Sequence, residues 1–278
     1  MEKSTPEHRY RFIELIAWWE GSINTSYITR QFGISRQQAS GDLTRYRELA
    51  PDNLCYNASR KLFLAQEPFT RHYISGNVVE YLTWLQTGHI ETQEASEKLP
   101  SLALKLPPRQ VLPQVMRGLV AAIRQQRRIE VDYVSLTNPN REGRIIAPHT
   151  FINTGLRWHL RAWCEKSQQY RDFVLSRFRG EPELLDKSPH TAEQDAAWNT
   201  DITLVFAPDP RLTPAKREVL EHDYQMKNGE LRITTKACLV QYLIQEMQVN
   251  TKILDGTPEA QQLVLVNRDD IREWLFEG

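Results

Sequence analysis

The chain has 278 residues and a formal net charge of zero, and its length allows two or three domains. Charged residues make up 25% of it, an ordinary share for a folded protein that buries sizeable cores. No run of about 18 apolar residues occurs, and the N-terminus lacks the apolar centre of a signal peptide, so neither membrane insertion nor export is expected. The expected compartment is the cytoplasm.

The three cysteines, Cys55, Cys164 and Cys238, lie far apart and form no CxxC pair. An odd, scattered set of this kind predicts neither a disulfide framework nor a zinc site. His72 and His89 stand alone in the sequence and are interpreted as surface or packing residues. We therefore expect no metal and no cofactor.

The zero net charge is an average over three unequal parts of the chain. Residues 1–104 carry 11 Lys and Arg against 12 Asp and Glu, residues 105–180 carry 14 against 5, and residues 181–278 carry 10 against 18. Such segregation predicts separate domains with different partners, and the basic middle part should attract an anion. The alternative is that the basic and acidic parts neutralise each other across an interface.

The first part of the chain predicts three helices. Apolar residues at helical spacing indicate a first helix over residues 6–20, and a second short helix is expected from residue 24 or 25. Gly33 forms the turn after the second helix. Ser35 is a suitable N-cap for a third helix that runs to about residue 49. This order is typical of a helix-turn-helix.

Two short strands predicted over residues 54–64, around a polar tip at residues 57–61, complete a winged helix over residues 1–67. Arg, Gln and Ser side chains reach base edges or phosphates in a major groove. The residues expected to contact DNA are Thr25, Ser26, Ser35, Arg36, Gln37, Gln38, Ser40, Thr44, Arg45, Ser59, Arg60 and Lys61. The alternative is a bundle that binds protein, since the charge of this part is nearly neutral. One such domain makes few base contacts, so we expect a homodimer on an inverted repeat in double-stranded operator DNA.

Residues 68–111 are interpreted as a helical connector with one helix near residues 75–85. The next domain, residues 112–188, begins with a predicted helix over residues 112–126. Short strands follow, including one at residues 129–134 and one that is expected to end at Pro148 and His149. One helix and about five short strands fit a small β-barrel of the Sm or SH3 kind.

The stretch from Arg157 to Arg179 predicts a β-hairpin with a turn at residues 165–169. In residues 157–162 polar and apolar side chains alternate, which is the period of a half-buried strand. The second strand is expected to place on one face Arg171, Phe173, Leu175 and Arg177. A guanidinium at the edge of an apolar surface needs an anionic partner, either from the protein or from a ligand.

Residues 112–180 resemble a WYL domain. Trp158-His159-Leu160 stands at the motif that names this family, with His in place of the middle Tyr. The other landmarks of the resemblance are Tyr133, Ser135, Arg144, Pro148 and the run from Phe173 to Arg177. The form RWHLRA is similar to the BrxR/CapW type of regulators, which are encoded beside bacterial phage-defence operons. The resemblance implies a winged helix, a WYL domain and a C-terminal dimerisation domain in that order.

Residues 189–278 are acidic and predict a small α+β sandwich without a catalytic set of residues. Strands are expected near residues 202–206, 230–235 and 263–266, and helices near residues 214–221, 237–247 and 269–276. The resemblance implies that this domain pairs two copies of the chain. The fold class is therefore multidomain α+β.

The basic middle domain predicts a site for an anionic ligand, either a nucleotide or a short single-stranded nucleic acid. The candidate residues are Tyr133, Ser135, Arg144, His149, His159, Arg161, Arg171, Phe173 and Arg177. Arg and Ser suit phosphate oxygens, and an aromatic ring can stack on a base. For each arginine the alternative is a structural ion pair with Asp132, Glu142 or Asp172.

The leading hypothesis is a transcriptional regulator, a repressor of a phage-defence operon from which an anionic ligand releases the operator. The alternatives of the same architecture are an activator and a nucleic-acid-binding adaptor. An enzyme acting on nucleic acid would need a metal-binding carboxylate cluster or a nucleophile with its base. The five scattered acids of the middle part show no DxD, HExxH or GxSxG spacing, so no enzyme is expected.

Overall fold

The computed structural model describes residues 4–90, 109–137, 139–249 and 257–275. The chain forms two compact units. Unit 1 takes in residues 1–148, 164–168 and 173–188, and unit 2 takes in residues 149–163, 169–172 and 189–278. Within the described ranges, no helix is both long enough and apolar enough to cross a membrane.

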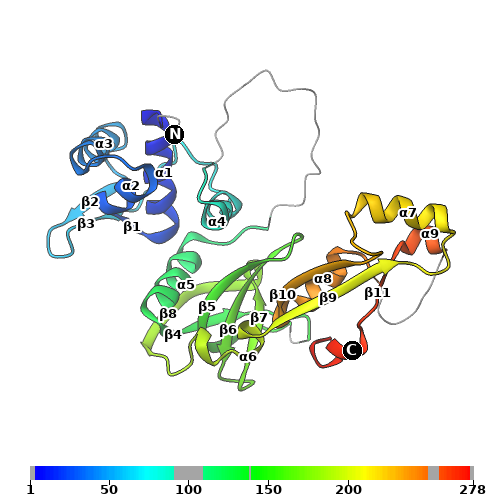
Figure 1. The fold of residues 1–278 in the computed structure, drawn as a ribbon. Helices are drawn as coiled ribbons and strands as arrows, with labels where there is room; N and C mark the ends of the chain where they lie inside the picture. Colours follow the sequence, from blue (N-terminus) through cyan, green and yellow to red (C-terminus); the bar gives the residue numbers. More distant parts are fainter. Residues whose placement is uncertain (1–3, 91–108, 138, 250–256, 276–278) are drawn as a thin grey trace. The chain divides into compact units, whose positions relative to one another are not determined.

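Unit 1 begins with a winged helix (Figure 1). Its elements are α1 (Pro6–Glu20), β1 (Ser22–Ile23), α2 (Thr25–Phe32), α3 (Arg36–Leu49), β2 (Leu54–Asn57), β3 (Leu62–Ala65) and α4 (Val78–Thr87). The strands form an antiparallel sheet in the order β1-β3-β2, with Tyr56 paired to Phe63 and Ser22 to Leu64. The three predicted helices and the wing are confirmed, whereas the two-residue strand β1 was not predicted.

The ends of these helices follow from local hydrogen bonds. The side chains of Thr5, Asn24 and Ser35 each accept a bond from a backbone N–H in the first turn of α1, α2 and α3. Gly33 ends α2 with a φ of 64°, a left-handed conformation that glycine adopts without steric cost. The turn between α2 and α3 is therefore specified by the sequence itself.

The middle of the chain, residues 113–187, contains a five-stranded sheet with the order β7-β6-β5-β4-β8. Its elements are α5 (Pro113–Gln125), β4 (Arg127–Tyr133), β5 (Glu142–Asn153), β6 (Trp158–Cys164), β7 (Gln169–Val174), the short 3-10 helix η1 (Leu175–Arg177) and β8 (Phe178–Lys187). Within the described residues this sheet has two edges, β7 and β8, so the closed Sm-like or SH3-like barrel stays a prediction.

Three details of this sheet correct the sequence interpretation. Strand β5 does not end at Pro148 and His149 but continues to Asn153. The ladder between β4 and β5 runs only from Glu142 to Ile146, so Pro148, which has no N–H, lies beyond it. The strand that was expected to run to Arg177 ends at Val174, because a 3-10 turn breaks the alternation there.

The third correction concerns burial of β6. This strand was predicted to be half-buried, yet His159 and Arg161 are buried along with Leu160 and Ala162, with exposed fractions of only 5% and 7% for the two polar residues. Their side chains contact other residues of unit 2 instead of water. The alternation in the sequence therefore reflects one polar and one apolar face of β6, and both faces are buried within the protein.

The acidic part of unit 2 contains a three-stranded antiparallel sheet with the order β10-β9-β11. Its elements are η2 (Ala192–Gln194), α6 (Ala196–Asn199), β9 (Asp201–Pro208), α7 (Pro214–Asp223), β10 (Leu231–Lys236), η3 (Ala237–Leu239), α8 (Val240–Glu246), α9 (Pro258–Gln261), β11 (Leu263–Leu265) and η4 (Asp269–Trp274). Val240 and Ile244 of α8 pack on Leu204 and Phe206 of β9 to form the core (Figure 1). The expected α+β arrangement is confirmed, although the last helix is of the 3-10 type.

Candidate nucleic-acid interface

Helix α3 presents one exposed face over its whole length. Its buried side is made of Ala39, Asp42, Leu43 and Tyr46. The residues that line a shallow depression on the opposite side are Arg36, Gln37, Ser40, Gly41, Thr44, Arg45 and Glu48. This face is polar and has the shape that allows a helix to enter a major groove.

Two buried polar contacts hold α3 against α1. Arg9 donates from Nε and Nη2 to the two carboxylate oxygens of Asp42, at 2.7 and 3.1 Å, and both residues are buried. Tyr46 donates its hydroxyl to Glu14 at 2.9 Å, and desolvation together with the Glu14 charge raises the pKa of Tyr46. These contacts fix the rotation of α3, and with it the direction in which the exposed face points.

Glu14 is a fully buried carboxylate that organises the base of the winged helix. One oxygen accepts backbone N–H groups from His72, Tyr73 and Ile74, at 2.8, 2.8 and 3.1 Å. The other oxygen accepts the Tyr46 hydroxyl. Four donors therefore converge on one charge, which is how a buried carboxylate is stabilised.

The exposed side chains of α3 differ in whether they already form hydrogen bonds or ion pairs within the protein. Arg36 and Gln37 make no side-chain hydrogen bond to any residue that the structure describes. Ser35 accepts the N–H of Gln38 as N-cap, at 3.1 Å, and Arg45 forms an exposed ion pair with Glu48 at 2.6 Å. Arg36 and Gln37 are thus the α3 side chains best placed to bond to a base edge.

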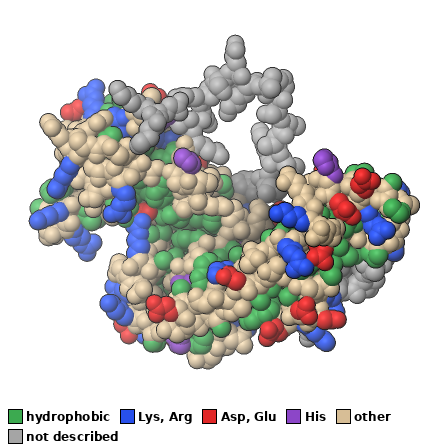
Figure 2. All heavy atoms as spheres, viewed as in Figure 1, with side chains coloured by type: hydrophobic (Ala, Val, Ile, Leu, Met, Phe, Trp, Pro, Cys, Tyr) green, Lys and Arg blue, Asp and Glu red, His purple; other side chains and the backbone are tan. Residues whose placement is uncertain are grey.

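The remaining predicted contacts lie at the start of α2 and at the wing tip. Ser26 is exposed and Thr25 is half-buried. At the tip, Asn57 accepts bonds from the Ser59 hydroxyl at 2.7 Å and from the Arg60 N–H at 3.0 Å, which tightens the turn. Arg60 and Lys61 are exposed, and Figure 2 shows basic side chains with few acidic ones along this edge of the winged helix.

The predicted ligand residues of the basic domain separate into two groups. In unit 1, the Tyr133 ring lies 5.0 Å from Phe173 and 5.8 Å from the guanidinium of Arg144. The Tyr133 hydroxyl is already used, since it accepts the N–H of Val174 at 3.0 Å. Arg144 lies 3.5 Å from Glu142, but its Nε is buried without a partner among the described residues. Within the described residues, this group therefore retains one unbonded guanidinium nitrogen on Arg144, whose guanidinium lies over the Tyr133 ring.

In unit 2, the guanidinium of Arg161 bonds to two acidic residues of the protein. Its Nε and Nη2 donate to the two oxygens of Asp195 at 2.6 and 2.9 Å, and its Nη1 donates to Asp172 at 3.0 Å. The Tyr242 hydroxyl donates to the other oxygen of Asp172 at 3.0 Å, and Nε2 of His149 lies 3.1 Å from Asp195. Burial lowers the pKa of Arg161, but Asp195 and Asp172 raise it by more. Of the two interpretations left open for Arg161, the structure favours the ion pair.

The other candidates are more scattered. His159 packs on the Tyr242 ring at 5.0 Å between centroids, and Ser135 lies 3.2 Å from the Thr137 hydroxyl. Arg171 is exposed and donates to Gln169 at 3.3 Å. Arg177 is half-buried, and its side chain makes no hydrogen bond or ion pair within the described part of the chain. Among the candidate arginines that the structure describes, Arg177 therefore forms no side-chain hydrogen bond or ion pair, and Arg144 keeps its Nε unbonded.

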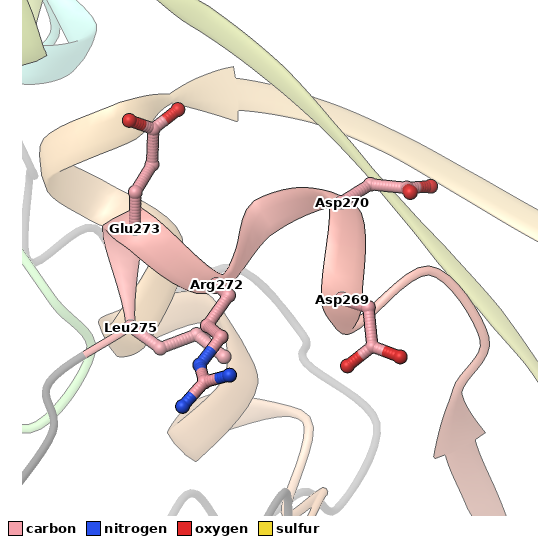
Figure 3. Close-up of a pocket in the computed structure, with 5 residues that line it drawn as sticks. All are labelled: Asp269, Asp270, Arg272, Glu273 and Leu275. Atoms are coloured by element: carbon pink, nitrogen blue, oxygen red, sulfur yellow. The ribbon is translucent and has the colours of Figure 1, made fainter.

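A further pocket lies at η4 in unit 2, lined by Asp269, Asp270, Arg272, Glu273 and Leu275. Figure 3 shows the carboxylates of Asp269, Asp270 and Glu273 pointing in different directions from the backbone. They do not converge on a point, so they make no cage for a cation.

The sequence interpretation missed residues of two kinds. Arg47 lies on the flank of the exposed face of α3, and its helical spacing from Arg36 and Ser40 was a usable signal. Asp195, which accepts bonds from both Arg161 and His149, gave no such signal because it is 34 residues away from Arg161 in a short loop.

The fold and the exposed helix define the class of winged-helix regulators that carry a WYL domain. Family models match on residues 6–87 (BrxR transcriptional regulator winged helix-turn-helix domain), 114–180 (WYL domain) and 201–271 (BrxR transcriptional regulator, C-terminal dimerization domain). The chain belongs to the BrxR/CapW family of regulators, which is not a family of enzymes.

Similar proteins span nearly the whole chain. The DNA-binding transcriptional repressor CapW of Pseudomonas aeruginosa is 35% identical over 274 residues, which cover 97% of this chain and 91% of that protein. The CapW repressor of Escherichia coli (strain KTE188) is 34% identical over 270 residues, 95% of this chain and 90% of that protein. The solved structure of proteasome accessory factor B/C of Arthrobacter aurescens aligns at a TM-score of 0.27 with 14% identity, and although 98% of this chain is covered, it spans only 48% of that chain.

Proposed function

We propose that the chain is a DNA-binding transcriptional repressor that reads its operator with α3. The observation that carries the proposal is the exposed face of α3, where Arg36 and Gln37 bond to no described residue through their side chains and where buried contacts at Asp42 and Tyr46 fix the helix. Arg and Gln are the side chains that pair with the major-groove edges of guanine and adenine. The naming of the CapW relatives as DNA-binding repressors supports the same function.

Replacement of Arg36 with alanine should weaken binding to the chain's own promoter by roughly 1–3 kcal/mol, since each base contact of this kind contributes that much discrimination. Arg36→Ala and Gln37→Ala together should bring the affinity for operator close to that for unrelated DNA. Gel shifts on both DNAs measure this difference. Arg30→Ala, in an exposed arginine of α2, is the matched control. Unchanged operator binding by the double variant would show that α3 is not the reading helix.

We propose further that the repressor is a homodimer on an inverted repeat. One α3 contacts only a few bases, so two copies are needed for operator-grade affinity. The match of residues 201–271 to a C-terminal dimerization domain supports pairing through unit 2. Sedimentation of the free protein and of its operator complex measures the assembly, and a monomer in both would contradict the proposal.

The regulated genes and the signal form the finer part of the proposal. By resemblance to its family, the chain would control a phage-defence operon and respond to a nucleotide or a short single-stranded nucleic acid. Two observations within the described residues support an anionic ligand in the basic domain: Nε of Arg144, beside Tyr133, has no hydrogen-bond partner, and the Arg177 side chain forms no ion pair. Such a ligand releases the operator only if it binds the DNA-free form more tightly, by about 1.4 kcal/mol for each tenfold loss of affinity.

Arg177→Ala should leave operator binding in the absence of ligand nearly intact and abolish release by single-stranded oligonucleotides or nucleotides. The reason is that Arg177 makes no ion pair within the described residues, so its loss removes a cation without exposing a buried partner. Titration of a fluorescent operator complex with these ligands measures release. Arg171→Ala is the control, because Arg171 is exposed and bonds to Gln169. Equal release from wild type and Arg177→Ala would place the effector site elsewhere.

A further inference from the structure

Arg47, in the last turn of α3, is a cation held in place without an acidic partner. Its guanidinium carbon lies 5.4 Å from the centre of the Phe63 ring, on strand β3 of the wing. Arg47 is exposed and forms no ion pair within the described part of the chain, in contrast to Arg45, which pairs with Glu48. A cation over a ring face is attracted to it, so the side chain is oriented while its N–H donors bond to no residue that the structure describes.

Tyr56 continues this arrangement on the neighbouring strand. It is paired directly with Phe63 across the β2–β3 ladder, and the two rings lie 5.0 Å apart. Tyr56 is 50% exposed, so its side chain is accessible to a binding partner. The result is a contiguous row of Arg47, Phe63 and Tyr56 that connects the end of α3 to the outer half of the wing, one pair before its tip.

The position of Arg47 on α3 indicates which part of the DNA the row of Arg47, Phe63 and Tyr56 would contact. Arg47 follows Arg36 by eleven residues, which is about 16 Å along the helix axis at 1.5 Å per residue and nearly the same direction around it. A major groove is about 12 Å wide, so a helix whose first turn reads base edges brings its last turn to the phosphate backbone at the groove's border. Arg47 and the Tyr56 hydroxyl would therefore meet phosphates rather than bases.

We propose that Arg47, seated on Phe63, and Tyr56 form a phosphate clamp that sets the depth and register of α3 on DNA. The inference rests on the proposed operator binding through α3 and adds the residues that position the helix. Phosphates are the same whatever the base sequence, so loss of a phosphate contact should weaken the binding of operator and of unrelated DNA by the same factor. In this it differs from Arg36, whose loss should affect the operator alone.

The test is the salt dependence of binding by the full-length protein. Loss of one phosphate contact should reduce the slope of log affinity against log salt by about 0.9, equivalent to roughly eightfold weaker binding at 0.1 M salt. Arg47→Ala should show this change on both DNAs, and Arg47→Lys should recover most of the slope because the charge remains. Tyr56→Phe, which removes only the hydroxyl, should weaken both DNAs with a smaller change in slope.

Arg71→Ala is the matched control for net charge. Arg71 also lies over an aromatic ring in the same winged helix, 5.4 Å from Trp18, but it lies outside α3 and the wing. If Arg71→Ala lowers the slope as much as Arg47→Ala, the effect is one of total charge and the clamp is wrong. If Arg36→Ala weakens the operator while Arg47→Ala leaves both DNAs unchanged, the clamp fails and the reading by α3 stands. If neither Arg36→Ala nor Arg47→Ala changes DNA binding, the proposed reading of the operator by α3 fails as well.

Discussion

Replacement of Arg161 with alanine should lower the free energy of unfolding of unit 2 by about 3–5 kcal/mol, the cost of breaking a buried ion pair by removing one partner. Arg161 bonds to both Asp195 and Asp172, and its side chain and theirs are at most 8% exposed. The alanine variant would leave two carboxylates buried next to each other without their cation. Urea denaturation followed by tryptophan fluorescence measures the loss.

Arg171→Ala provides the control for this effect. Arg171 has the same charge and lies on the adjacent strand β7, but it is exposed, and among the described residues its side chain bonds only to Gln169. Its removal should change stability by no more than about 0.5 kcal/mol, as for other surface substitutions. Equal, small losses for Arg161→Ala and Arg171→Ala would mean that the buried network contributes nothing to stability.

The same network should make stability depend on pH in a defined window. Burial raises the pKa of Asp195, but hydrogen bonds from His149 and Arg161 outweigh it and lower the pKa to about 2. An unfolded aspartate titrates near pH 3.9, so the folded state favours the charged form. The stabilisation is therefore fully present above about pH 5 and is lost as the pH falls through about 2. Denaturation between pH 6 and pH 2 should show a steeper loss for wild type than for Arg161→Ala.

The winged helix could be predicted from the sequence because its information is local. Apolar spacing, the caps at Asn24 and Ser35, and the left-handed turn at Gly33 each specify structure within a few residues. The exposed face of α3 follows from the same periodicity. Asp42 is the exception, since its burial depends on a partner 33 residues away, Arg9 in α1.

The basic domain was harder to predict because its arginines are chemically alike but meet different partners. Arg161 and Arg171 lie in neighbouring strands of one predicted hairpin, yet one is buried against Asp195 and the other is exposed. The difference depends on a loop that follows the sheet in sequence, and no periodic pattern encodes it. In the same way, the 3-10 turn at Leu175 moved Arg177 out of the predicted strand face.

Replacement of Glu14 with alanine should have a comparably large effect on the winged helix. Glu14 accepts the backbone N–H groups of residues 72–74 and the Tyr46 hydroxyl, and it is completely buried. The Tyr46 hydroxyl and the Ile74 N–H form buried bonds to Glu14, and each buried donor left without an acceptor costs about 1–3 kcal/mol, so the variant should lose at least about 2 kcal/mol of stability. Glu14→Gln keeps one acceptor oxygen and should lose less.

Glu7→Ala is the matched control, because Glu7 lies on the same helix α1 but is exposed. Its loss should leave both the unfolding midpoint and operator affinity nearly unchanged. Glu14→Ala should lower operator affinity even in the fraction that stays folded, since Tyr46 then loses the contact that helps to fix the rotation of α3. Urea unfolding and gel shifts on the same samples separate the two effects. If Glu14→Ala unfolds and binds as Glu7→Ala does, the buried carboxylate does not hold α3 in its reading position.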